Sequence, residues 1–374
     1  MSSRESNLRL VLMPNILKFG TLVDEKLKLI RGEEQSNIVN LKLDRFSNGE
    51  GKATLLDSIR GKDVFLFSDV GNYGPESLYT SRGYEYLKSP DDHFQDIKRV
   101  ISAMNGKENS LHVVMPLLYQ SRQDKRKTTE SLDCSDALRE LEFRGVDGII
   151  TFDVHNPAVE NALQHCSFDN LYPTYSVLSR FVEEEIYDPN NLMIVAPDTG
   201  AMDRAIYYAD ALGVDVGVFY KRRDFSKVVN GKNPIVEHKF LGNDVKGKDL
   251  IITDDMIASG SSILEVATDM KKRGANKLYL VATFPLFTEG EKSVKAFDDA
   301  HKDGVFHKLY TTNVTYVPEE IQNRDWFKEV DCSKYLAKVI NAIYERESIR
   351  PFLDGRTKIS EKMKTLGKYP TKKN

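Results

Sequence analysis

The chain has 374 residues, a length that corresponds to about two domains. Its 53 basic and 56 acidic side chains leave a formal net charge of −3, which argues against a nucleic-acid coat protein or a binder of anionic membranes. With 40% hydrophobic and 29% charged residues, the composition is that of a globular protein. No apolar run approaches the ~18 residues of a membrane span, and the first residues lack a signal-peptide core. We therefore expect a cytosolic protein with neither nucleic acid nor membrane as a partner.

Short apolar runs alternate with amphipathic stretches along the chain. The predicted helices cover roughly 92–104 and 134–143, and the predicted strands are 63–68, 111–115, 148–153, 192–196, 214–220, 249–254 and 277–283. Strands that are apolar almost throughout and separated by helices indicate a parallel sheet covered on both faces. The sequence therefore predicts an α/β protein.

A weak internal repeat divides the chain. A helical stretch ends on Arg-Gly just before a strand at Gly145 and again at Gly274, and each glycine suits the left-handed position after a helix. Because helix–Gly–strand is common in α/β folds, the repeat alone leaves open whether the halves share a fold. The predicted domains are 1–165 and 166–345, followed by a basic tail over 346–374. We expect 71–90 to be a long loop and the tail to be solvated or frayed.

The segment 249–265 carries the most chemical information. It predicts a buried strand that ends in Asp254 and Asp255, a loop of small and hydroxyl residues, and a helix. Such a loop presents backbone N–H groups and hydroxyls to a phosphate at the helix N-terminus, and the two acids are suited to ribose hydroxyls or magnesium. The alternative is an acidic strand end with a plain turn. The loop residues are Ala258, Ser259, Gly260, Ser261 and Ser262.

This segment resembles the phosphoribosyl-diphosphate (PRPP) motif of type I phosphoribosyltransferases, and five further segments resemble the ribose-phosphate pyrophosphokinase family in that family's order. They are Phe46-Ser-Asn-Gly-Glu50, Tyr119-Gln-Ser-Arg-Gln-Asp-Lys-Arg126, Asp153-Val-His-Asn156, Ala196-Pro-Asp-Thr-Gly200 with the following residues to Ala205, and Tyr220-Lys-Arg-Arg-Asp224. The resemblance implies two tandem phosphoribosyltransferase-like domains with central parallel sheets flanked by helices.

The resemblance also implies an activity: ribose 5-phosphate and MgATP would give PRPP and AMP. It assigns ATP binding to Phe46, Asn48, Gly49, Glu50, Arg122 and Gln123, magnesium to His155 and Asp198, and ribose 5-phosphate to Asp254, Asp255 and the loop 258–262. Lys221 and Arg223 would be catalytic, because pyrophosphoryl transfer needs cations around the β-phosphate. The partners would be the two substrates and further copies of the chain, in a dimer-based oligomer of up to six subunits.

Several positions depart from the family pattern. Ala258 replaces an acid of the PRPP loop, Lys127 stands where many family members carry an acid, and Phe284 replaces a histidine. These departures motivate a second hypothesis, a non-catalytic homologue that regulates a partner enzyme. The third is a phosphoribosyltransferase that consumes PRPP, which shares the loop but has no use for the ATP-type motifs.

Overall fold

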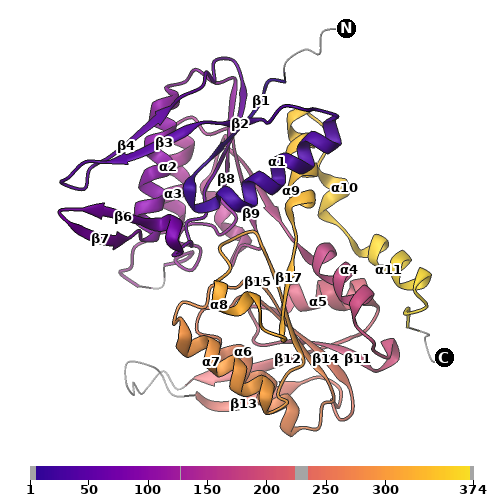
Figure 1. Ribbon diagram of the computed structural model, residues 1–374. Coiled ribbons are helices and arrows are strands. Elements are labelled where there is room, and N and C mark those ends of the chain that lie inside the picture. The colour runs from indigo at the N-terminus through magenta and orange to yellow at the C-terminus, as the bar shows by residue number, and fades with distance from the viewer. Residues whose placement is uncertain (1–5, 127, 224–234, 371–374) are drawn as a thin grey trace. The chain divides into compact units, whose positions relative to one another are not determined.

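A computed structural model describes residues 6–126, 128–223 and 235–370, and the chain forms two compact units (Figure 1). The first unit contains residues 1–173, 313–316 and 331–353, and the second contains 174–312, 317–330 and 354–374. Strand β10 (Ser167–Leu171), which the predicted boundary assigns to the second domain, pairs with β9 in the first unit.

The first unit is built on a six-stranded parallel sheet in the order β10-β9-β8-β5-β1-β2. Its other strands are β1 (Leu8–Leu12), β2 (Ile38–Val39), β5 (Asp63–Phe67), β8 (Ser110–Val114) and β9 (Gly148–Phe152). Its helices are α1 (Leu17–Arg31), α2 (Pro90–Met104), α3 (Asp133–Phe143), α9 (Ser333–Tyr344) and α10 (Arg350–Leu353), with 3-10 turns η1 (Pro14–Ile16), η2 (Pro75–Ser77) and η3 (Pro157–Ala162). Helix α9 comes from far along the chain and packs against α1.

The second unit is built on a seven-stranded sheet in the order β13-β12-β11-β14-β15-β16-β17, in which only the β12–β13 pair is antiparallel among the described pairings. Its strands are β11 (Leu192–Ala196), β12 (Asp215–Arg223), β13 (Ile235–Leu241), β14 (Asp249–Met256), β15 (Leu278–Phe284), β16 (Lys308–Thr312) and β17 (Phe327–Val330). Its helices are α4 (Thr174–Glu184), α5 (Met202–Leu212), α6 (Ser261–Lys272), α7 (Glu291–Lys302), α8 (Glu319–Gln322) and α11 (Arg356–Thr365), with the turn η4 (Pro189–Asn191).

These elements confirm the predicted α/β fold and its apolar strands. Strands β11 and β15 are buried along their whole length, as parallel strands covered on both faces must be. Both repeat glycines have the predicted left-handed conformation, with φ of 87° at Gly145 and 88° at Gly274. In the part of the chain that the structure describes, no helix is long and apolar enough to cross a membrane.

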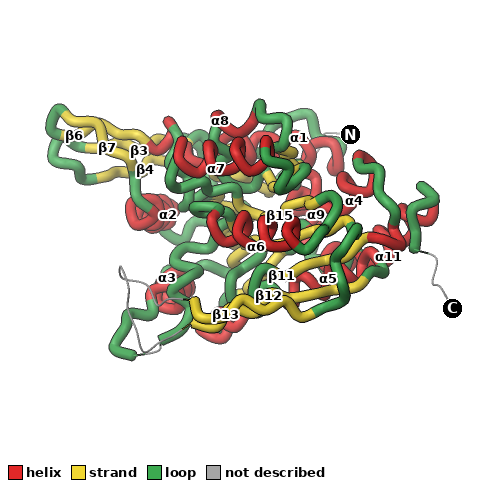
Figure 2. The backbone as a smooth tube through the Cα atoms, turned by 90° about the horizontal axis from the view of Figure 1, so that it is seen from below, coloured by secondary structure: helices red, strands yellow, loops and turns green. Residues whose placement is uncertain are grey.

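The prediction of a long loop over 71–90 is wrong. After η2, the chain forms an antiparallel hairpin of β6 (Leu78–Ser81) and β7 (Tyr84–Leu87). Its turn residues Arg82 and Gly83 have φ of 51° and 77°, the conformation of a two-residue hairpin turn whose twist matches the strands. A second hairpin, β3 (Leu41–Arg45) and β4 (Gly51–Leu55), lies beside it in both views (Figures 1 and 2).

The prediction of a solvated or frayed tail is also wrong for the described residues. Helix α11 packs against α4 and α5 (Figure 2), where Ile359 and Met363 are buried. Lys368 Nζ donates to the carbonyl oxygens of Val182 (2.6 Å) and Glu185 (2.7 Å) at the end of α4. Lys358, Lys362 and Lys364 thus lie on a helix whose buried apolar side chains hold it to the second unit.

Candidate active site

The loop between β14 and α6 has the geometry of an anion-binding site. Its backbone is fixed by hydrogen bonds from Ile257 N to Phe284 O (2.8 Å) and from Thr288 N to Ala258 O (3.0 Å). Helix α6 begins directly after Gly260 and has no acidic residue in its first turn. The positive end of the helix dipole is therefore uncompensated where the loop meets it, as phosphate binding requires.

Gly260 is required for the close packing of this loop. Its φ is 78°, and a Cβ atom there would lie 2.2 Å from Cε2 of Phe297, whose side chain is fully buried. On the other side of the loop, the hydroxyls of Ser259 and Ser261 lie 3.0 Å apart. The glycine lets the backbone sit against an aromatic core while the serine hydroxyls remain at the loop surface.

The acids before the loop interact electrostatically. Burial and the neighbouring charge of Asp255 raise the pKa of Asp254 to about 7, against the opposing effect of Arg204. The charge of Asp198 also raises this pKa, so Asp198 lies within electrostatic reach of Asp254. Asp198 follows β11, and Asp254 and Asp255 lie at the carboxyl end of β14, the neighbouring parallel strand, so these acids meet at one edge of the sheet.

Asp198 is exposed and its position is set by its own loop. Its Oδ1 accepts hydrogen bonds from Gly200 N (2.8 Å) and Ala201 N (3.1 Å), just before α5 begins. The second carboxylate oxygen of Asp198 is the one left to face a ligand.

The donor set fits magnesium that is held together with phosphates. Magnesium in phosphate-binding sites takes one or two carboxylates and completes its coordination with substrate oxygens and water. Within the described ranges, no group of three or more His, Cys, Asp or Glu side chains could hold a metal ion by itself. A magnesium ion at Asp198 would therefore depend on the phosphates of a substrate.

In the first unit, the predicted adenine-binding turn 46–50 joins β3 to β4. Phe46 N donates to Glu50 O (2.8 Å), Gly49 N donates to Phe46 O (2.8 Å), and Gly49 has a φ of 96°. Asn48 Oδ1 accepts from Glu50 N at 3.1 Å, while 55% of Phe46 is exposed. The turn therefore presents an aromatic ring and polar groups at the tip of a hairpin.

The other predicted residues of the first unit follow β8 and β9. Arg122 is exposed, and Gln123 Nε2 donates to Ser131 O at 2.6 Å, so this amide is engaged by the backbone. His155 is exposed just after β9. Asn156 Nδ2 donates to Asp124 Oδ2 at 2.6 Å, which ties the loop of Gln123 to the loop of His155.

The predicted catalytic residues Lys221 and Arg223 lie at the end of β12, where the backbone pairs with β13. Their side chains, the whole of 224–234 and Lys127 lie outside the described residues.

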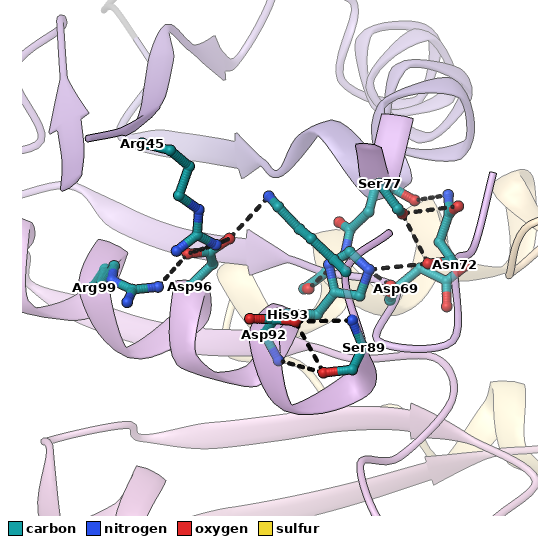
Figure 3. Close-up of polar contacts among 12 residues, drawn as sticks. Arg45, Asp69, Asn72, Ser77, Ser89, Asp92, His93, Asp96 and Arg99 are labelled. Carbon is teal, nitrogen blue, oxygen red and sulfur yellow. Dashed lines mark hydrogen bonds and ion pairs between the residues drawn. The ribbon is translucent and has the colours of Figure 1, made fainter. Parts of the chain in front are cut away.

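The sequence interpretation missed two buried polar groups around α2 (Figure 3). Asp96, only 2% exposed, accepts hydrogen bonds from Arg45 (2.8 and 2.9 Å), Lys88 (2.9 Å) and Arg99 (2.6 Å). Beside it, Asn15 Nδ2 contacts His93 Nδ1 at 3.0 Å, and His93 Nε2 lies 2.9 Å from the carbonyl of Asn72. The available signal was the position of His93 and Asp96 on the apolar stripe of α2, where polar side chains need buried partners.

Asp69 is the second buried carboxylate of this region. It accepts hydrogen bonds from Gly71 N (3.0 Å) and Tyr316 N (2.7 Å), and burial raises its pKa to about 7. The Tyr316 ring fills the space that a side chain at position 74 would need. Asp69 therefore holds the returning segment 313–316 in the first unit.

Comparisons with known proteins agree with this architecture. The family model of the N-terminal domain of ribose phosphate pyrophosphokinase matches residues 16–145, and that of the phosphoribosyl transferase domain matches 175–323. The chain is 26% identical over 330 residues to a ribose-phosphate pyrophosphokinase of Chlorobaculum tepidum (87% of this chain, 90% of the relative). It is 27% identical over 309 residues to that of Wolinella succinogenes (82% and 88%).

Among solved structures, the phosphoribosylpyrophosphate synthetase of Mycobacterium smegmatis aligns with a TM-score of 0.75 at 20% identity, over 91% of this chain and 100% of that one. At that identity the likeness concerns the fold. Together with the two family models, it confirms the prediction of two tandem phosphoribosyltransferase-like domains with parallel sheets.

Proposed function

The chain belongs to the ribose-phosphate pyrophosphokinase family, a family of transferases, and from this premise we propose that it makes PRPP for nucleotide biosynthesis. The C1 hydroxyl of ribose 5-phosphate attacks the β-phosphorus of ATP, its oxygen gains the pyrophosphoryl group and loses its proton, and AMP leaves with the electrons of the broken P–O bond. The observation that carries the proposal is the anion-binding loop 258–262, which adjoins Asp254 and Asp255 in a chain that also has the ATP-type motifs.

In this proposal the second unit binds ribose 5-phosphate. Backbone N–H groups and hydroxyls of the loop donate hydrogen bonds to the oxygens of the 5-phosphate at the start of α6. Asp254 and Asp255 accept hydrogen bonds from the ribose hydroxyls. With a pKa of about 7, Asp254 is only partly ionised near neutral pH. Hydrogen bonds from ribose hydroxyls, or a nearby cation, would stabilise its charged form when the ligand binds.

The first unit supplies the ATP-binding residues in the same proposal. The Phe46 ring offers a face for the adenine, while Arg122 pairs with phosphate oxygens. His155 and Asp198 would hold magnesium, which supplies neutralisation of phosphate charge when bound. Lys221 and Arg223 offset the charge that develops on the transferred group.

We also propose that the chain works in the cytosol as a dimer-based homo-oligomer, since the family's Phe46-type turn completes the ATP site of a neighbouring subunit. Light scattering on the purified chain measures the assembly. A monomer with full activity would contradict this part of the proposal.

The deciding measurement is the formation of AMP and PRPP from ATP and ribose 5-phosphate in the presence of Mg²⁺. Lys221→Ala should lower kcat by at least about 10²-fold, the scale of a lost transition-state contact. Lys239→Ala is the matched control, because Lys239 is an exposed lysine on the paired strand β13. Equal activity of the two variants would contradict the role of Lys221.

A non-catalytic regulator is the second candidate, and Ala258 in the PRPP loop favours it. It predicts ATP binding without any magnesium-dependent product, and a changed rate when a catalytic family member is mixed with the chain. A PRPP-consuming transferase predicts release of pyrophosphate from PRPP and a base, with no need for ATP.

A further inference from the structure

The β6–β7 hairpin contacts the predicted adenine-binding turn directly. Ser81 Oγ donates to the carbonyl oxygen of Ser47 at 3.1 Å, and Arg82 N donates to the same oxygen at 3.2 Å. Ser81 is only 5% exposed, whereas Ser47 is an exposed residue in the middle of the turn. The hairpin therefore carries two donors that converge on one acceptor of the turn.

The turn needs support from outside because it lies at a hairpin tip. Its residues 46, 47, 48 and 50 are exposed, so hydrophobic burial contributes little to their position. An exposed turn samples several conformations unless hydrogen bonds select one of them. A ligand that binds one conformation loses apparent affinity in proportion to the fraction of time spent in the others.

The turn of the β6–β7 hairpin sets the direction in which the Arg82 N–H points. Arg82 has a φ of 51°, in the left-handed region that side chains other than those of glycine and asparagine rarely adopt. The conformation is the one in which Arg82 N donates to Ser47 O. The hairpin turn therefore also directs this donor at the carbonyl of Ser47.

Two further contacts join the hairpins to each other and to α2. The guanidinium of Arg45, the residue before the turn, lies over the Tyr79 ring of β6 at 5.1 Å from its centroid. Arg45, the last residue of β3, binds the buried carboxylate of Asp96 on α2 (Figure 3). Lys88, the first residue after β7, binds the same carboxylate. The first hairpin is therefore anchored to α2 directly before its turn, the second is anchored directly after β7, and Ser81 and Arg82 join their two turns.

We propose that Ser81 is a positioning residue for adenine nucleotide: it holds the turn 46–50 in its binding conformation through the carbonyl of Ser47. The inference rests on the proposed function for the identity of the ligand. Ser81 itself does not touch the nucleotide, and the β6–β7 hairpin acts as a brace for the turn.

The test compares two isosteric substitutions, Ser81→Thr and Ser81→Val, which differ in the hydroxyl and share the same packing. We expect Ser81→Thr to match the wild type. Ser81→Val should raise the KM for ATP about two- to tenfold, the effect of one hydrogen bond, with kcat and the KM for ribose 5-phosphate unchanged. Thr80→Ala is the matched control, because Thr80 is the exposed neighbour on the same strand.

Calorimetric titration with ADP gives a readout that does not need turnover, and the same two- to tenfold loss should appear there for Ser81→Val. If the wild type forms no PRPP, the proposed function fails while the titration still tests the brace. Equal ADP affinity of the Thr and Val variants would overturn the inference. So would a fall in kcat together with a rise in both KM values, since that pattern reports a general loss of structure.

Discussion

Substitution of Gly260 by alanine tests the reasoning about the anion-binding loop most directly. The new Cβ would meet the Phe297 ring at 2.2 Å, and that ring cannot easily move. It is fully buried and packs against Phe287 and Trp326, with ring centroids 5.1 and 5.5 Å away. The substitution therefore forces either the loop or the aromatic cluster to shift.

The expected cost has two parts. A left-handed φ of 78° costs an alanine about 1–2 kcal/mol relative to glycine, and overpacking of a close-packed core costs about 1–3 kcal/mol. Gly304 offers a control for the first part, because its φ is 69° and a Cβ there has no neighbour within 4 Å. Gly304→Ala should then destabilise the protein by about 1–2 kcal/mol and Gly260→Ala by about 2–5 kcal/mol. Both substitutions change the unfolded chain in the same way, so that effect cancels when the two variants are compared.

The assay is urea unfolding followed by the fluorescence of Trp326, the single tryptophan of the chain, which lies in this aromatic cluster. Its signal reports the second unit without mixing in the unfolding of the first. Phe297→Leu should remove part of the clash, so the double variant with Gly260→Ala should cost less than the sum of the single variants. A loss for Gly260→Ala within about 0.5 kcal/mol of that for Gly304→Ala would refute the claim of rigid packing.

Other substitutions test the buried carboxylates, the tail and the loop. Asp96→Asn should destabilise the first unit by about 3–5 kcal/mol in calorimetry, because three cations lose their charged partner, whereas the exposed Asp136→Asn should cost less than about 0.5 kcal/mol. Burial raises the pKa of Asp69 to about 7, so between about pH 4 and 7 the folded state binds a proton that the unfolded state does not. The contribution of Asp69 to stability is therefore largest at acid pH and is lost as the pH rises through 7. The stability difference between wild type and Asp69→Asn should therefore fall by about 2–3 kcal/mol from pH 5 to 8, and no pH dependence would contradict the shift. Met363→Ala should cost about 2–5 kcal/mol and expose the segment after Leu353 to proteolysis; unchanged protection would speak against α11 as a packed helix. Ala258→Asp should lower the KM for ribose 5-phosphate if this position contacts the ribose, and an unchanged KM would remove it from the site.

The sequence by itself determined the α/β class, most strands and the place of the loop 258–262 between a buried strand and a helix. These features are local: apolar runs, an acidic strand end and small residues before a helix can be read from neighbouring positions. The motifs also predicted which strand ends carry polar side chains. Asp198 follows β11 and Asp254 lies at the end of β14, its parallel neighbour, within electrostatic reach of Asp198.

Only the tertiary structure decided how distant segments complete each unit. Asp96 on α2 forms ion pairs with Arg45 of the first hairpin and with Lys88 after the second. Asp69 accepts a hydrogen bond from the backbone N–H of Tyr316, which lies far along the chain. The hairpin at 78–87 was predicted as a loop because its exposed strands lack an apolar alternation. The basic tail was predicted to be solvated because only two side chains of α11, Ile359 and Met363, are buried, too few to show as an apolar pattern. Asp96 and Arg45 are 51 residues apart, Lys368 and Val182 are 186 apart, and Asp69 and Tyr316 are 247 apart, so no pattern of neighbouring residues predicts these partners.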